Sequence, residues 1–123
     1  ITPERADSMR EVLAAETSTV GDPAAGWGRS SEAFHAEMAG MTGNPILDLF
    51  GKSLISLLAD RTRSIFPSDE RESTCRIHKR IADAIIGGEA DEAARLTEVH
   101  ASALNAKMVE LFPYLLQEPI EWH

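Results

Sequence analysis

The sequence predicts an all-α fold, an antiparallel bundle of about five to six helices. Helix-favouring Ala, Leu, Glu and Arg dominate the chain, and β-branched or aromatic runs with the two-residue alternation of a strand are missing. Glycine and proline signals divide the chain into segments of helical length. Long helices joined by short turns are typical of antiparallel bundles.

Five helices are expected in order, and their ends follow from local signals. They cover about residues 3–20, 31–41, 45–66, 69–86 and 90–112. Thr2 is the expected cap of the first helix, and Asn44 is the expected cap of the third. Gly87-Gly88 ends the fourth helix, and Pro113 ends or kinks the fifth. No element is assigned to the tail after Pro113.

Composition excludes several classes of protein. The 123 residues fit a single domain, and 43% hydrophobic residues suffice for a core. The formal net charge of -8 disfavours direct contact with nucleic acid. No apolar run approaches the roughly 20 residues of a membrane helix. A single cysteine, Cys75, excludes an intrachain disulfide and fits a reducing, cytoplasmic compartment. The chain begins at Ile1, without an initiator methionine, and two expectations stay open, a fragment of something longer or a stand-alone domain.

Three histidines lie on the inner sides of three predicted helices. His78 precedes Ile81 and Ile85 on one apolar stripe, His100 lies between Leu96 and Leu104 on another, and His35 precedes Met38. Buried imidazoles need hydrogen-bond partners, and convergence on one metal ion would satisfy all three rings. The alternative is that each is an ordinary core histidine with a local partner. His123, in the tail, is not expected to take part.

Other polar residues lie near these histidines in the sequence. Ser31 lies one turn before His35, and Glu32 is a candidate additional metal ligand as part of a Glu-x-x-His pair. A solvated residue in the first turn of a helix explains Glu32 equally well. Cys75 lies three residues before His78 and can be either a thiolate ligand or a small buried side chain.

Arg61 is the candidate partner of an acidic ligand. It continues an apolar stripe of the third predicted helix, three residues after Leu58 and seven after Leu54. That stripe comprises Ile46, Leu47, Phe50, Leu54, Leu57, Leu58 and Ile65. A guanidinium on such a stripe needs an anion, and a bound carboxylate supplies one in bidentate geometry. A snorkelling arginine or an ordinary ion pair is the competing interpretation.

The order of several short motifs resembles the FadR C-terminal (FCD) domain, the effector-binding domain of one branch of the GntR-family bacterial transcription regulators. The motifs are Phe34-His35, Thr42-Gly43-Asn44-Pro45-Ile46-Leu47, the segment 78–85, the segment 88–94 and His100. The resemblance extends over about residues 3–111.

The resemblance implies a function and a set of ligands. Family members are helical bundles that dimerise and follow a winged helix-turn-helix domain. Many hold a metal ion with one Asp and three His, and bind small carboxylates beside it. The family histidines correspond to His35, His78 and His100, whereas the family Asp falls on Ser31, a departure from the pattern.

We therefore predict one effector-binding domain over residues 1–123, without the winged helix-turn-helix and the first family helix. It is expected to hold a divalent metal, Zn or Ni, at His35, His78 and His100, and to bind a small organic acid through Arg61 and Ser31. Its expected partners are a second copy of itself and, through an upstream domain, DNA. The alternatives are a hydrolase-like metalloenzyme with an open three-His site, or a structural helical dimerisation module.

Overall fold

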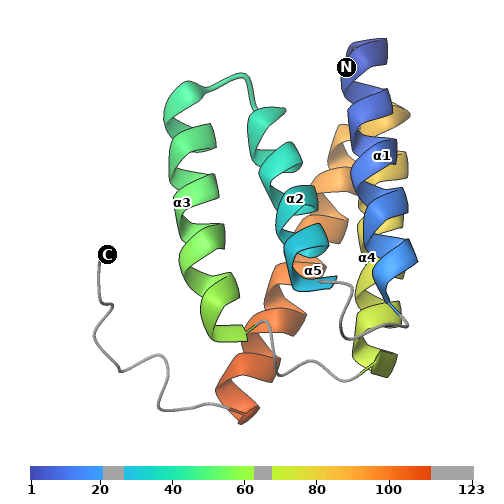
Figure 1. Cartoon of the computed structure of the whole chain (residues 1–123). Coiled ribbons are helices and arrows are strands. Elements are labelled where there is room, and N and C mark those ends of the chain that lie inside the picture. Colours follow the sequence, from blue (N-terminus) through green and yellow to red (C-terminus); the bar gives the residue numbers. More distant parts are fainter. Residues whose placement is uncertain (21–26, 63–67, 112–123) are drawn as a thin grey trace.

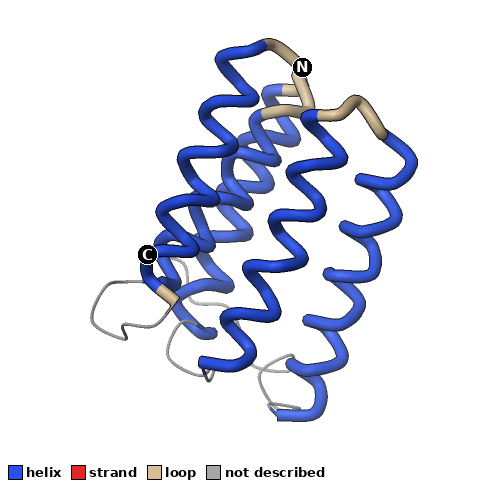
Figure 2. The backbone as a smooth tube through the Cα atoms, turned by 90° about the vertical axis from the view of Figure 1, so that its right-hand side faces the viewer, coloured by secondary structure: helices blue, strands red, loops and turns tan. Residues whose placement is uncertain are grey.

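A computed structural model describes residues 1–20, 27–62 and 68–111 of the chain. These ranges contain α-helices and no strand, so the predicted all-α bundle is confirmed. The helices are α1 (Pro3–Thr19), α2 (Trp27–Gly40), α3 (Pro45–Thr62), α4 (Ser68–Ile86) and α5 (Ala90–Leu111). Each runs antiparallel to the one before it (Figure 1), and their axes stay roughly aligned when the molecule is turned by 90° (Figure 2).

The predicted helix ends follow the local signals closely. The Thr2 hydroxyl accepts a hydrogen bond from the Arg5 backbone N–H at 3.3 Å, and Asn44 Oδ1 accepts from the Ile46 N–H at 3.0 Å. Gly88, with a φ of 73°, closes α4 in the left-handed conformation that glycine adopts without strain. One start differs from the prediction, because α2 begins at Trp27 rather than near Ser31. The ends predicted at Phe66 and Phe112 lie outside the described residues.

The core lies among α1, α2, α4 and α5. α1 packs against α2 and α4, and α5 packs against α4. The buried hydrophobic cluster comprises Met9, Phe34, Ile81, Ala82, Ala84 and Leu96. Two ionisable side chains, Glu16 and His78, are fully buried beside this cluster. Burial of charged groups requires close partners, which makes this part of the core the first place to look for function.

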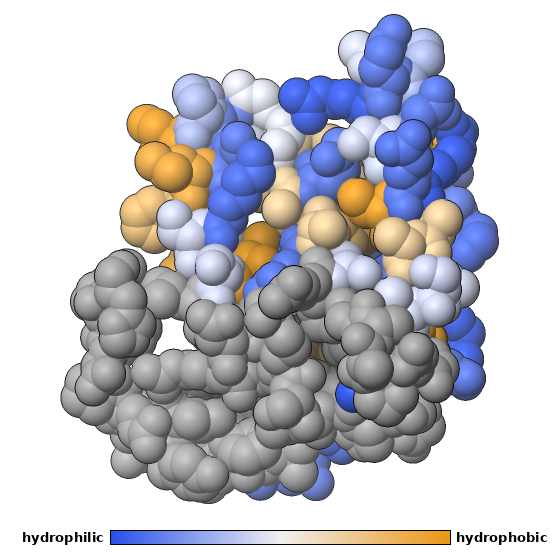
Figure 3. All heavy atoms as spheres, in the orientation of Figure 1, coloured by the Kyte–Doolittle hydropathy of each residue, from blue (hydrophilic) through white to orange (hydrophobic). Residues whose placement is uncertain are grey.

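α3 packs against α2 and leaves much of its apolar stripe uncovered. Gly51 permits a close approach, because a Cβ atom there would meet the Ala39 Cβ at 3.0 Å. Four apolar side chains of α3 nevertheless remain exposed, namely Ile46, Leu47, Phe50 and Leu54. Figure 3 shows hydrophobic side chains on the surface at this edge of the bundle. The described helices therefore leave these four members of the expected stripe unburied, while the side chains of Leu57, Leu58 and Ile65 lie outside the described residues.

None of the helices in the described ranges combines the length and the apolar character needed to cross a lipid bilayer.

The contrast between α4 and α3 predicts unequal effects of the same substitution. Ile81 is fully buried, whereas Ile46 is 72% exposed. Ile81→Ala should lower the free energy of unfolding by about 2–5 kcal/mol, because it removes buried methyl groups and leaves a cavity. Ile46→Ala, the matched control, should change it by less than about 0.5 kcal/mol. Urea denaturation followed by circular dichroism measures both, and equal effects would contradict the described core.

Candidate metal centre

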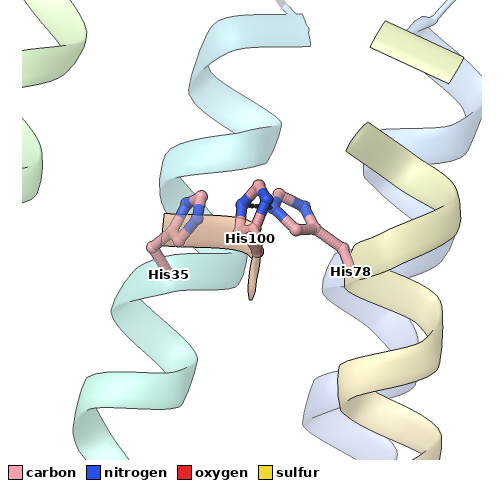
Figure 4. Close-up of side chains that lie close together, drawn as sticks. All are labelled: His35, His78 and His100. Atoms are coloured by element: carbon pink, nitrogen blue, oxygen red, sulfur yellow. Dashed lines mark hydrogen bonds between the residues drawn. The ribbon is translucent and has the colours of Figure 1, made fainter. Parts of the chain in front are cut away.

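Three histidines from three helices meet in the interior. His35 comes from α2, His78 from α4 and His100 from α5, and their rings point toward one another (Figure 4). One ring nitrogen from each residue can be chosen so that all three atoms lie within 4.8 Å of one another. The ring centroid of His78 lies 4.7 Å from that of His35 and 4.8 Å from that of His100. The structure therefore brings together three side chains that are distant in the sequence.

His78 is the most enclosed member of the cluster. Its side chain has no exposed surface, and the Phe34 ring stacks on it with centroids 4.2 Å apart. Its Nε2 lies 3.0 Å from Nε2 of His100. Two imidazole nitrogens at this distance form a hydrogen bond only when one of them carries a proton and the other offers a lone pair. A bound cation removes the need for that proton, because both lone pairs can then bind the ion.

His35 is oriented by its own helix. Its Nδ1 donates to the backbone carbonyl oxygen of Ser31 at 2.8 Å, one turn earlier in α2. A carbonyl oxygen can only accept, so Nδ1 carries the proton and Nε2 of the neutral ring keeps a free lone pair. Fixing the tautomer in this way is typical of histidines that bind metals.

Glu16, from α1, is a member of the site that the sequence analysis missed. Its carboxylate oxygens lie 2.9 and 2.8 Å from Nδ1 of His78, and its side chain is fully buried. The side chains of Cys75 and Ser31 also form hydrogen bonds with this carboxylate. A signal was present in the sequence, because Glu16 lies seven residues after Met9 and three after Leu13, on the inner stripe of α1.

The environment shifts the acid–base equilibria of this cluster. Burial, followed by the electrostatic effect of His78, lowers the pKa of His35 to about 4 and that of His100 to about 4. Burial raises the pKa of Glu16, but the hydrogen bond and electrostatic effect of the His78 ring, together with hydrogen bonds from Cys75 and Ser31, leave that pKa below its ordinary value. His35 and His100 are therefore neutral at pH 7, which is the form that binds metal ions.

These donors fit a divalent transition-metal ion. Two nitrogens bound to one zinc ion at about 2.0–2.1 Å lie at most about 4.2 Å apart. The three histidine nitrogens, which lie within 4.8 Å of one another, would reach this spacing after small movements of the rings. Three nitrogen ligands from separate helices leave further coordination positions for water or another ligand. The chemistry of the donor set thus suits such an ion, and imidazole is accepted by zinc, nickel, copper and iron alike.

Comparison with known proteins assigns the family. The profile of the FCD domain matches residues 1–103. The chain belongs to the FCD domain family. No curated protein and no solved structure matches it significantly. FCD domains belong to transcription regulators, and the match supports an effector-binding module of such a regulator.

Within the described ranges, the remaining residues that the sequence analysis singled out do not join the three-histidine cluster as ligands. Ser31, at the position that the family resemblance gives to an Asp, lies on α2 and bonds to Glu16. In the part of the chain that the structure describes, neither Glu32 nor Cys75 belongs to the group of converging metal-ligating atoms. Arg61 lies within α3, but its side chain is outside the described residues, as is the whole of His123.

A cavity opens beside the centre between α4 and α5. Its volume is about 360 Å³, within the range of small-molecule sites, and His100 contributes to its wall. The wall is mostly apolar, with Ile77, Val99 and Leu104 among its residues. Lys107 also lines it and pairs with Glu70 at 2.7 Å. An ion held by the histidines would therefore have room for a small molecule near it.

The lowered pKa values predict that the metal-free FCD domain loses stability in mild acid. The folded pKa of about 4 for His35 and His100 lies below the value of 6.5 for an unperturbed ring. Between these values the unfolded chain takes up a proton at each ring and the folded chain does not, so stability falls as the pH decreases from about 6.5 to 4. Melting temperatures measured in EDTA between about pH 6.5 and 4 test this prediction. The double variant His35→Gln, His100→Gln should show a weaker dependence of the melting temperature on pH. A melting temperature that rises on acidification would contradict the prediction.

Proposed function

We propose that this FCD domain is the effector-sensing and dimerisation module of a GntR-family transcription regulator. It binds a small organic acid at a divalent metal ion held by His35, His78 and His100. The observation that carries the proposal is the convergence of three ring nitrogens, from three helices, to within 4.8 Å. Membership of the FCD family supports the regulatory role.

Each residue of the centre has a defined task in this proposal. His35 and His100 present neutral rings, and the Ser31 carbonyl holds His35 in the tautomer whose Nε2 carries the free lone pair. His78 presents the third nitrogen from the core of the bundle. When bound, a Zn or Ni ion supplies positive charge and open coordination positions that attract a carboxylate.

The acidic effector has two further recognition elements in this proposal. Arg61 pairs with a carboxylate of the effector, because a guanidinium binds a carboxylate through two parallel hydrogen bonds. Ser31 offers a hydroxyl group next to His35 on α2. The cavity lined by His100 accommodates the apolar part of the molecule. The effector is therefore a small organic acid with a modest apolar body.

The response of the regulator follows from the origin of the ligands. Since the three histidines belong to α2, α4 and α5, a molecule that binds among them changes the relative free energies of different helix arrangements. In a homodimer such a change repositions the two subunits, and DNA is contacted through a separate domain attached to this one. The exposed apolar side chains of α3 are available for contact between subunits.

Metal content tests the first part of this proposal. FCD domain purified without a histidine tag should contain about one divalent metal ion per chain, measured by inductively coupled plasma mass spectrometry. His100→Ala and His78→Ala should each weaken zinc affinity by at least about 100-fold, since each removes one of three ligands. His100 is only partly buried, which makes His100→Ala the variant that better preserves the fold.

His123→Ala is the matched control, because it removes the one remaining histidine of the chain. Its zinc affinity should equal that of the unmodified protein. Absence of metal from the unmodified protein after dialysis against zinc and nickel would overturn the metal-dependent part of the proposal.

Thermal shifts with simple acids test the second part. In zinc-loaded protein, at least one of succinate, lactate and benzoate should raise the melting temperature by about 4 °C or more at ten times its Kd. Arg61→Gln should abolish the shift, whereas Arg76→Gln, on the exposed surface of α4, should preserve it. An equal shift in EDTA-treated protein, or in Arg61→Gln, would contradict binding between the metal and Arg61.

A further inference from the structure

The buried carboxylate of Glu16 is not explained by the packing of the bundle alone. Its side chain has no exposed surface, although the removal of a carboxylate from water costs several kcal/mol without partners. Both of its oxygens face Nδ1 of His78, at 2.9 and 2.8 Å, across 62 residues of sequence. Hydrogen bonds with the side chains of Ser31 and Cys75 complete its surroundings.

This pairing dictates the state of the His78 ring. A carboxylate can only accept hydrogen bonds, so Nδ1 of His78 must carry a proton. The proton-free position of the neutral ring is then Nε2, which lies on the opposite edge, 3.0 Å from Nε2 of His100. Glu16 thus directs the lone pair of His78 toward His100.

The position of Glu16 also separates it from the ligands themselves. Its oxygens lie beside Nδ1 of His78, whereas Nε2 on the other edge of that ring lies 3.0 Å from His100. Among the described residues, the group of converging ligand atoms contains the three histidines and does not include this carboxylate. Glu16 is therefore placed behind a ligand rather than among the ligands, the position in which a carboxylate strengthens a metal-bound histidine.

We propose that Glu16 is the positioning residue of the three-histidine centre. It holds His78 with Nδ1 protonated and Nε2 facing the cluster, and it places one negative charge next to a bound cation. The inference rests on the proposed function, because it assumes that the cluster binds a metal ion. A contact that only stabilised the core would not require Nε2 of His78 to lie 3.0 Å from a second imidazole, that of His100.

The affinity for metal tests this role. Glu16→Gln keeps the shape of the side chain but removes the charge, and it should weaken zinc binding by about 10–100-fold in competition with a chromophoric chelator. Glu11→Gln, an exposed position on the same helix, is the matched control and should bind zinc like the unmodified protein. Equal affinities for Glu16→Gln and the unmodified protein would overturn the inference while leaving the proposed function intact.

A stability measurement separates this role from general stability. Glu16→Gln should show its loss of zinc affinity under conditions where circular dichroism finds the variant fully folded in EDTA. A loss of affinity that only follows the unfolded fraction of the variant would contradict a role for the negative charge.

The tautomer of His78 provides a test that needs no variant. Long-range ¹⁵N–¹H correlation spectra of the metal-free protein at pH 7.5 should show a protonated Nδ1 for His78, and an unprotonated Nδ1 would overturn the inference. Protein that binds no zinc but keeps this proton would overturn the proposed function instead, and the orientation of His78 by Glu16 would stand. The two failures are therefore distinguishable.

Discussion

The buried contact between Glu16 and His78 is the constraint on which the arrangement of the centre depends. It joins α1 to α4 in the core, where neither side chain can exchange its partner for water. Phe34 of α2 stacks on the same imidazole, so the ring is held in place by three helices. Removal of one member of such a pair leaves an uncompensated polar group, which makes the contact far less tolerant of change than the surrounding apolar packing. The positions of His35 and His100 follow from helices packed around this fixed ring.

A centre assembled from three helices is suited to sensing. Each histidine belongs to a rigid element, so the separation of the ring nitrogens changes whenever one helix shifts against another. A ligand that prefers one separation therefore favours one helix arrangement, and this preference is the differential affinity that any ligand-driven change requires. A site built on a single loop would adapt to its ligand locally and would transmit less to the rest of the domain.

Much of this structure could be predicted from the sequence, and the remainder has a common physical cause. Thr2, Asn44 and Gly88 act locally, so their roles as caps and stops follow from neighbouring residues alone. The inward direction of three histidines could be read from helical periodicity, although their meeting at one point depends on packing. Glu16 was missed because carboxylates are expected at the surface, and its partner lies 62 residues away. Spacing from Met9 places Glu16 on the inner stripe, but only the tertiary fold shows which ring it meets.

The apolar stripe of α3 is a second case in which the sequence predicts the face of a helix but not its tertiary contacts. Periodicity locates the hydrophobic side of a helix but says nothing of what covers it, and here Ile46 and Phe50 remain exposed at the edge of the bundle. α2 connects this surface to the centre, because it carries His35 and also packs closely on α3 where Gly51 meets Ala39. With so little space at this crossing, a displacement of α2 caused by a ligand at His35 displaces α3 as well. The close packing of α2 on α3 therefore gives the three-histidine cluster a mechanical connection to the exposed apolar side chains of α3.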